Sequence, residues 1–207
     1  MIHVEFFDLI TIEIPYPKVY SRLGYAKGTT TLTSRQKADI EKNIDEASGY
    51  ITLKGAGCRL AIERKEEHKV VLSGAIEFNS QAISRFLHDS QEVLFMGATA
   101  GADIINKIKE QAAHDNVTAA VVFDALASEM VDEALSWIME FFDYQVRREN
   151  KQLTPGRYSA GYNDFSLDNQ KIMCETLQMS ELGVKLNDHY ILIPEKSVTA
   201  IAGIQPI

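Results

Sequence analysis

The sequence predicts an α+β fold: a twisted antiparallel sheet or meander with flanking helices, in a single domain over residues 1–207. Three observations predict this class. β-like apolar segments lie at the start, in the middle and at the end of the chain. Apolar residues recur at helical spacing between them. No repeat, low-complexity tract or convincing linker divides the chain, although its length alone would also allow two small domains.

The first half of the chain combines β-like segments with capped helices. The opening stretch, MIHVEFFDLITIEI, is β-like until Pro15 and Pro17, which break a strand and allow a helix to begin. Thr33 or Ser34 can cap a second helix over residues 35–48, and the glycine that follows closes its end.

The middle of the chain changes character. Residues 50–78, YITLKGAGCRLAIERKEEHKVVLSGAIEF, are rich in Ile, Val, Leu and Thr and contain glycines and a polar RKEEH turn, which predicts an antiparallel meander. A capped helix is expected to begin near Ser80.

A buried strand is expected over residues 92–100, EVLFMGATA, running into a helix over residues 101–114. Gly97 and Gly101 would permit a tight passage between the two. The longest element is a helix from Val117 to about Arg148, where apolar residues recur every three or four positions. It would be roughly 45 Å long at about 1.5 Å per residue.

The last third is predicted to contain a loop, one helix and short β-like pieces. Ser166 can cap a helix from Leu167 to about Met179. GVKL at 183–186, YILIP at 190–194 and SVTAIAGI at 197–204 are the β-like pieces.

Composition excludes several classes of function. The net charge of −8 and the pI near 5.2 argue against a non-specific nucleic-acid binder. Acids interrupt the first residues, where a signal peptide needs a basic start, and no run approaches the roughly 20 apolar residues of a membrane helix. We therefore expect a soluble, cytoplasmic protein without a nucleic-acid or membrane partner.

Neither a metal site nor a catalytic constellation is predicted. Cys58 and Cys174 lie far apart and outside any C-x-x-C pattern, so neither a disulfide framework nor a zinc site is indicated. The five histidines are scattered singly. GATAG at 97–101 matches a phosphate-binding loop only loosely, and a packed helix start explains it better.

The stretch RYSAGY at 157–162 carries the most chemical information. The Arg157 fork can hold a carboxylate through two parallel hydrogen bonds, which a lysine cannot reproduce. Gly161 would let the main chain approach a ligand, and Tyr162 offers a flat surface for a ring. The alternative is an arginine that caps the preceding helix or pairs with an acid, followed by an ordinary Gly-Tyr turn.

RYSAGYNDFSLDNQKI, followed by LGVKLNDHYILIPEKSVTAI, resembles the activation domain of cobalamin-dependent methionine synthase. In that family an R-x-x-x-G-Y loop binds S-adenosylmethionine, and a helix, an iGv-L turn and a P-x-x-S-V strand follow in this order. The likeness is specific over Arg157–Ala200. Upstream, FDALASEMVDEAL resembles the family's long helix before the loop, and YSRLGYAKG is similar to the N-terminal segment of stand-alone bacterial members.

The resemblance implies a set of S-adenosylmethionine-binding residues. Arg157 would hold the methionyl carboxylate, the backbone of Ser159, Ala160 and Gly161 would line the ligand, and Tyr162 would flank it or face the corrin. The family's long helix also carries a glutamate near the site, for the ligand ammonium group. Simple alignment places Ser128 there, with Glu129 one residue and about 100° of helix rotation away, and we take Glu129 as the candidate.

The resemblance also implies a reaction and partners. The synthase's oxidised cobalamin would be methylated from S-adenosylmethionine while a flavodoxin-like donor supplies one electron. Such a protein contributes positioning and no catalytic residue, because the reduced corrinoid is the nucleophile and the sulfonium already provides a good leaving group. The chain has no cobalamin-binding domain, so the cobalamin would be carried by a partner, either a truncated methionine synthase or another corrinoid protein. A basic patch at Arg147, Arg148 and Lys151 could receive the electron donor.

Two departures from the family pattern carry expectations of their own. Synthase domains continue beyond the P-x-x-S-V strand into a segment whose paired tyrosines contact the ligand, whereas this sequence stops at Ile207, so we expect the sulfonium side to be open or completed by another chain. A proline-rich stretch after Gly-Tyr is replaced by residues 163–166. The alternative function is therefore a non-catalytic module of the same fold that docks on a corrinoid protein without using S-adenosylmethionine, or an interaction protein that retains the fold alone.

Overall fold

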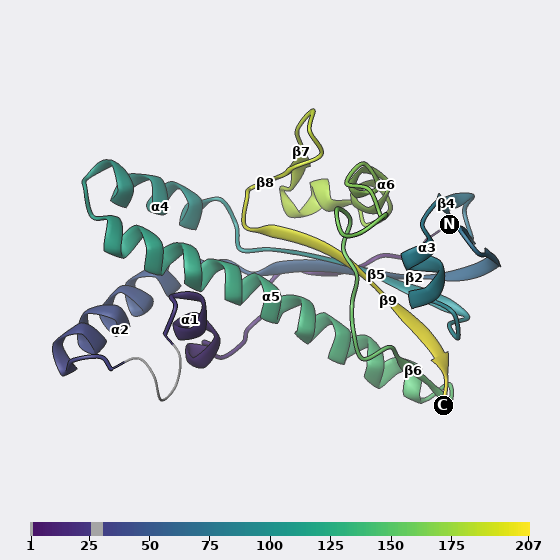
Figure 1. The fold of residues 1–207 in the computed structure, drawn as a ribbon, viewed down its shortest axis with the longest axis horizontal. Coiled ribbons are helices and arrows are strands. Elements are labelled where there is room, and N and C mark those ends of the chain that lie inside the picture. The colour runs from purple at the N-terminus through teal and green to yellow at the C-terminus, as the bar shows by residue number, and fades with distance from the viewer. Residues whose placement is uncertain (1, 26–30) are drawn as a thin grey trace.

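The computed structural model describes residues 2–25 and 31–207, and it has the predicted α+β architecture (Figure 1). A mostly antiparallel sheet has the strand order β4-β3-β2-β5-β9-β6, and β1 pairs with β2. A small hairpin of β7 and β8 is separate. Residues 26–28, the end of the YSRLGYAKG segment, lie outside the described residues. The strands are β1 (Glu5–Phe7), β2 (Lys54–Glu66), β3 (Lys69–Leu72), β4 (Ile76–Phe78), β5 (Glu92–Thr99), β6 (Lys151–Leu153), β7 (Lys185–Leu186), β8 (Leu192–Ile193) and β9 (Ser197–Pro206).

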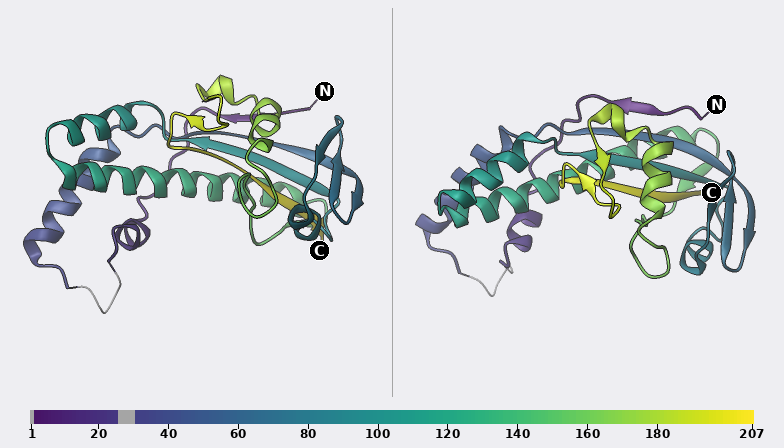
Figure 2. Two further views of the ribbon diagram at one scale, coloured as in Figure 1. Left: turned by 45° about the horizontal axis from the view of Figure 1, so that its top comes forward. Right: turned by 90° about the horizontal axis from the view of Figure 1, so that it is seen from above.

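Helices cover both faces of the sheet. The long helix α5 crosses one face, with α2 and α4 packed on its first half beyond the end of the sheet, and α6 with the short helix η1 lies on the other face, as the views in Figures 1 and 2 agree. None of the helices in the described residues is both long and apolar enough to cross a membrane. The helices are α1 (Tyr16–Arg22), α2 (Ser34–Ser48), α3 (Gln81–Phe86), α4 (Asp103–Ala113), α5 (Val117–Arg147), α6 (Asn169–Thr176) and the 3-10 helix η1 (Met179–Leu182).

The central strand β5 shows why the sheet has two apolar cores. Leu94 and Met96 belong to the core under α5, whereas Val93 and Phe95 belong to the core under α6. Side chains alternate between faces along a strand, so burial of both faces requires a continuous apolar run. The unbroken apolar run VLFM at 93–96 is therefore explained by layers on both sides.

The long helix lies very close to the sheet. A Cβ atom on Gly57 would come within 2.4 Å of the Phe142 ring, and one on Gly55 within 2.6 Å of Ile138 Cδ1. Real Cβ contacts are never this short, so the two glycines of β2 create the space in which α5 packs.

Several helix boundaries follow the predicted capping signals. Thr33 accepts from the Gln36 amide and Gln36 reaches back to the Thr33 amide, a complete capping box for α2. Ser80 caps α3 by accepting from Ile83 N at 3.0 Å. Gly101 has a φ of +85° and turns the chain from β5 towards α4.

Four local predictions need correction. Ser166 does not cap α6, because its hydroxyl bonds Asp168; the helix begins at Asn169 and ends at Thr176. The polar turn is shorter than RKEEH, since β2 continues to Glu66 and β3 begins at Lys69. Residues 197–204 are not a short piece but most of the ten-residue strand β9.

The fourth correction concerns Gly97, which is not part of the passage from strand to helix. It lies within β5, paired with Ala56 and Thr199. A Cβ atom at this position would come within 2.5 Å of the Met179 sulfur. Gly97 is therefore required by the packing of η1 on the sheet rather than by a turn.

Candidate functional site

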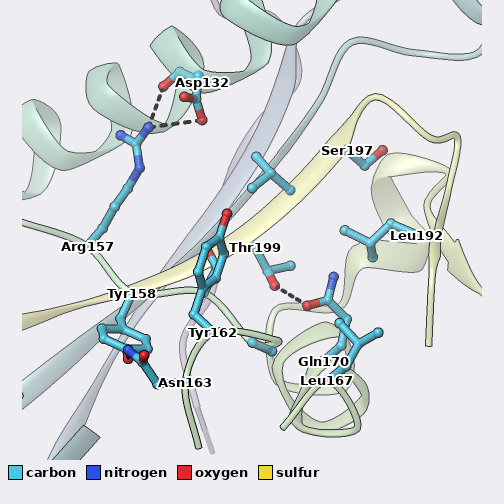
Figure 3. A pocket seen from close by; sticks show the side chains of 13 residues that line it. Asp132, Arg157, Tyr158, Tyr162, Asn163, Leu167, Gln170, Leu192, Ser197 and Thr199 are labelled. Carbon is cyan, nitrogen blue, oxygen red and sulfur yellow. Dashed lines mark hydrogen bonds and ion pairs between the residues drawn. The ribbon is translucent and has the colours of Figure 1, made fainter. Parts of the chain in front are cut away.

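A pocket of about 500 Å³ lies beside the loop that contains Arg157 (Figure 3). Its walls come from α5, from the loop over residues 157–163, from α6 and from the first residues of β9. Charged groups lie on its α5 side and apolar groups on its α6 side. The lining residues are Asp132, Arg157, Tyr158, Ser159, Ala160, Tyr162, Asn163, Leu167, Gln170, Leu192, Ser197, Val198 and Thr199.

The loop is attached to the sheet at its first residues. Tyr158 and Ile201 exchange backbone hydrogen bonds of 2.9 and 2.8 Å, which fix the loop against β9. Gly161 has a φ of +93°, a conformation that side-chain-bearing residues rarely adopt, and its amide donates to Phe165 O at 2.7 Å. Phe165 is fully buried against Phe78, so the loop closes on the second core.

Asp164 attaches the other end of the loop to α3. Its carboxylate accepts from Ser80 Oγ at 2.7 Å and from the amides of Gln81 and Ala82 at 2.6 and 3.2 Å. The Ser80 hydroxyl bond and the two amide bonds lower the pKa of the Asp164 carboxyl, because they stabilise its charged form. Asp164 thus anchors the end of the loop by hydrogen bonds.

Arg157 reaches from this loop to α5. Its Nη2 lies 3.0 Å from Asp132 Oδ1 and 3.4 Å from the Asp132 carbonyl oxygen, and its Nη1 donates to Ser136 Oγ at 3.1 Å. The Arg157 side chain is 26% exposed and that of Asp132 is 47% exposed. Figure 3 shows this pair at the edge of the pocket, so both charges are within reach of a ligand.

A second cation makes a parallel contact two turns earlier on α5. Lys196, directly before β9, lies 2.7 Å from Asp124 Oδ1 and donates to Ser128 Oγ at 2.9 Å. Acid and serine are again four residues apart, which places them on one face of the helix. This contact holds the start of β9 against α5, and none of its three side chains lines the pocket.

The inner wall of the pocket contains a buried amide. Gln170 is 7% exposed, and its Oε1 accepts a hydrogen bond of 3.1 Å from Thr199 Oγ1 on β9. Leu167 and Leu192 lie on either side of it in Figure 3. The sequence alone gave no signal for Gln170, because a glutamine in the first turn of a short helix is usually a surface residue.

The predicted ligand residues fall into two groups. Arg157, Ser159, Ala160 and Tyr162 line one pocket, with Gly161 in the same loop. Tyr162 is 67% exposed.

Glu129 lies elsewhere. It is 8% exposed, forms an ion pair with Arg22 of α1, and borders a different depression together with Lys18. The acid that faces the Arg157 pocket is Asp132, three residues further along α5. Sequence reasoning missed it, although the recurrence of Asp124, Ser128, Asp132 and Ser136 every four residues marks one polar stripe.

The cations expected to form a basic patch all have partners. Arg147 pairs with Asp143, Arg148 stacks on the Tyr144 ring, and Lys151 contacts Glu92 and Glu149. The surface around them is a mixed network of charges rather than a free positive patch.

The two cysteine thiols are free and lie outside the Arg157 pocket. Burial raises the pKa of the Cys58 and Cys174 thiols to about 12, with a smaller contribution from Glu175 at Cys174, so both remain protonated at neutral pH. Within residues 2–25 and 31–207, no three His, Cys, Asp or Glu side chains converge to hold a metal ion.

Comparisons with known proteins identify the fold. No family model matches the sequence, and no curated protein sequence matches it. Among solved structures, the fold is similar to one described as the crystal structure of the MetH reactivation domain bound to AdoHcy, with a TM-score of 0.68 and 13% identity. The match covers 99% of this chain and 79% of that chain. The predicted resemblance is thereby confirmed at the level of the fold.

Proposed function

We propose that this chain, whose fold is that of a reactivation domain, binds S-adenosylmethionine beside Arg157 and presents its methyl group to the corrinoid of a partner protein. The observation that carries the proposal is the Arg157–Asp132 pair at the edge of a pocket lined by the R-x-x-x-G-Y loop. The solved structure with this fold holds AdoHcy, which is S-adenosylmethionine without its transferable methyl group.

The ion pair suits the amino-acid end of the ligand. An α-amino acid is a zwitterion, so its carboxylate can take the Arg157 fork while its ammonium group takes the Asp132 carboxylate. On binding, Arg157 would exchange the Asp132 carboxylate for the ligand carboxylate, and Asp132 would exchange the guanidinium for the ligand ammonium group. Neither side chain would be left without an opposite charge. We therefore assign the ammonium contact to Asp132; Glu129, which pairs with Arg22, has no part in the proposed site.

The remaining lining residues suit the rest of the ligand. Ser159 and Ala160 line the pocket, and Gly161 beside them holds the loop at a positive φ, so we assign the backbone of these three residues to the ligand. Tyr162 and Leu192 offer apolar surface for the sugar and the ring.

The chain's contribution to methyl transfer would be binding and orientation. The partner's corrinoid supplies the nucleophile, and the sulfonium of the ligand already contains a good leaving group, so no residue of this chain needs to move a proton. Holding the methyl group in line with the acceptor converts an encounter of two molecules into a reaction within one complex. The exposed edge at Tyr162 leaves one side of the ligand accessible to a partner.

We further propose that the partner is a methionine synthase without its own reactivation domain, or another corrinoid protein, acting with a flavodoxin-like electron donor in the cytoplasm. The paired cations at Arg147, Arg148 and Lys151 do not offer that donor a free basic surface. Its contact would lie on the partner or on the complex.

Isothermal titration with S-adenosylmethionine tests the binding step. We expect saturable binding to the wild type and none detectable to Arg157→Ala. Arg147→Ala is the matched control, because that arginine pairs with Asp143 at the end of α5 and lies outside the pocket. Equal binding by the wild type and Arg157→Ala would contradict the assignment of the pocket.

Methyl transfer in trans tests the second step. A corrinoid protein, a chemical reductant and S-adenosylmethionine carrying a labelled methyl group are mixed with the wild type or with Arg157→Ala, and label on the corrinoid is counted. We expect transfer only with the wild type. If Arg157→Ala docks on the corrinoid protein as the wild type does and neither transfers label, the chain is a docking module without S-adenosylmethionine chemistry.

A further inference from the structure

The buried amide of Gln170 has an unusual environment. Gln170 lies near the start of α6, is 7% exposed, and faces Thr199 of β9, which is 1% exposed. The Thr199 hydroxyl donates to Gln170 Oε1 at 3.1 Å, so the orientation of the amide is set from the sheet. Two polar side chains are thus buried in a wall that also contains the apolar side chains of Ala160, Leu167, Leu192 and Val198.

The orientation leaves the amide nitrogen directed into the pocket. With Oε1 turned to Thr199, the two Nε2 hydrogens have no hydrogen-bond acceptor within the part of the chain that the structure describes. Figure 3 shows this nitrogen pointing towards the space beside Leu192. Tyr20 Oη and Ser90 Oγ are the enclosed side-chain atoms without a partner among the described residues, so Gln170 Nε2 is open to water in the pocket. A ligand that brings an acceptor to this position would replace that water, whereas a ligand without an acceptor would leave the donor unpaired.

Gln170 and Arg157 lie on opposite sides of the pocket in Figure 3. A ligand whose zwitterionic end binds Arg157 and Asp132 therefore extends its other end towards Gln170. In S-adenosylmethionine that end is the nucleoside, which carries ring-nitrogen and hydroxyl acceptors. The apolar side chains of Leu167 and Leu192 would lie against its flat ring.

We propose that Gln170 Nε2 donates a hydrogen bond to an acceptor of the nucleoside half of the ligand, and that Thr199 orients it. Gln170 is then a specificity residue and Thr199 a positioning residue. The inference rests on the proposed function, because it takes the ligand to be an S-adenosyl compound. A site built to donate to an acceptor discriminates against ligands that lack it, since its own buried donor is then left unpaired.

Two probes separate the two ends of the pocket. S-adenosylhomocysteine contains both the amino acid and the nucleoside, whereas 5′-methylthioadenosine contains the nucleoside alone. Affinities for both are measured by calorimetry or competition for the wild type, Arg157→Ala, Gln170→Met, Gln170→Glu and Thr199→Val. Gln170→Glu and Thr199→Val preserve side-chain shape, and thermal unfolding of each variant reports on the fold.

We expect Gln170→Met and Gln170→Glu to weaken both probes by about tenfold, the effect of losing one good hydrogen bond. Thr199→Val should weaken both by roughly threefold, because it frees the amide to rotate. Arg157→Ala should weaken S-adenosylhomocysteine strongly and leave 5′-methylthioadenosine unchanged. The Gln170 variants should thus weaken both probes, whereas Arg157→Ala should weaken only one. A general loss of packing would not distinguish the two probes in this way.

Unchanged affinity of the Gln170 variants for S-adenosylhomocysteine would overturn the inference and leave the proposed function standing. Loss of S-adenosylhomocysteine with 5′-methylthioadenosine unaffected would also overturn it, since the amide would then contact the amino-acid half. A wild type that binds neither probe overturns the proposed function together with the inference.

Discussion

Helix α5 forms two ion pairs with the same spacing of acid and serine, and the two pairs differ in their access to the pocket. Lys196 binds Asp124 and Ser128, and Arg157 binds Asp132 and Ser136. Acid and serine are four residues apart in both cases, so each cation meets them on one face of the helix.

The difference between the pairs lies in the cation and in its access to the pocket. The Lys196 ammonium has three donors, and the two bonds to α5 use most of them, whereas Arg157 has five donors in a planar fork. Arg157 lines the pocket and its side chain is 26% exposed, while Lys196 is 17% exposed and lies outside the lining. The same spacing of acid and serine on α5 therefore holds Lys196 in a contact outside the pocket, and Arg157 in a contact that a ligand in the pocket could replace.

The largest effect on ligand affinity is expected when Arg157 is replaced by lysine, the cation of the other ion pair. Arg157→Lys should weaken S-adenosylmethionine binding by about a hundredfold, because a point charge cannot hold Asp132 and a carboxylate in the fork geometry. Calorimetric titration measures it, with the conservative reverse exchange Lys196→Arg as the control. Wild-type affinity in Arg157→Lys would mean that the fork is irrelevant and that the two pairs are equivalent.

The acids provide the next comparison. Asp132→Asn should lower ligand affinity about tenfold, since the ligand ammonium loses a charged partner. Asp124→Asn, the same change two turns earlier, should leave affinity unaltered. Parallel titrations of the two variants decide the point; equal losses would show that both acids act through the fold rather than through ligand contact.

Lys196→Met tests the opposite expectation, a change in stability without a change in binding. Removing the partly buried ammonium should lower the free energy of unfolding by about 1 kcal/mol, or the melting temperature by about 3 °C. The affinity for S-adenosylmethionine should stay within twofold of the wild type. Thermal unfolding and titration of the same preparation measure both, and an unchanged melting temperature would contradict a structural role for this pair.

The smallest effect is expected at a third ion cluster, beyond the end of α5. The hydrogen bond from Arg59, aided by Lys151, lowers the pKa of Glu149 to about 2 from its ordinary 4.5. A lowered pKa in the folded state stabilises the fold above pH 4.5, and this contribution disappears as the pH falls towards 2. Glu149 is 42% exposed, so solvent screens most of the effect.

Urea unfolding of Glu149→Gln between pH 3 and pH 7 measures that contribution. At pH 7 the urea concentration at the unfolding midpoint should be slightly lower for Glu149→Gln than for the wild type. The difference between the two midpoints should narrow as the pH falls. A gap that widens on acidification would mean that the carboxylate is destabilising in the folded protein. Ligand affinity should not change, which distinguishes this cluster from the Arg157 pair.

Most features that depend on neighbouring residues were predicted correctly from the sequence. Features that depend on contacts with distant parts of the chain were predicted less well. The cap at Thr33, the cap at Ser80 and the turn at Gly101 depend on residues a few positions away, and all three are present. Ser166 has the right residue type for a cap, but Asp168 competes for its hydroxyl. Gly97 is explained only by Met179, more than eighty residues later.

The site shows the same division. The loop residues were predictable because the R-x-x-x-G-Y spacing is contiguous, and they lie together at the pocket. The acid on α5 that faces the pocket could not be predicted, because successive residues of a helix point about 100° apart and an error of one position changes the face. Only the packing of α1 decides that Glu129 meets Arg22, and only the path of the loop decides that Asp132 meets Arg157.

The glycines beneath α5 have a mechanical consequence. Because Gly55 and Gly57 admit Ile138 and Phe142 to within contact distance of the β2 backbone, a side chain at either glycine would push α5 away from the sheet. Within the helix, Asp124 and Asp132 are about 12 Å apart, eight residues at 1.5 Å each, so the contacts of Lys196 and Arg157 lie at a spacing that α5 itself sets.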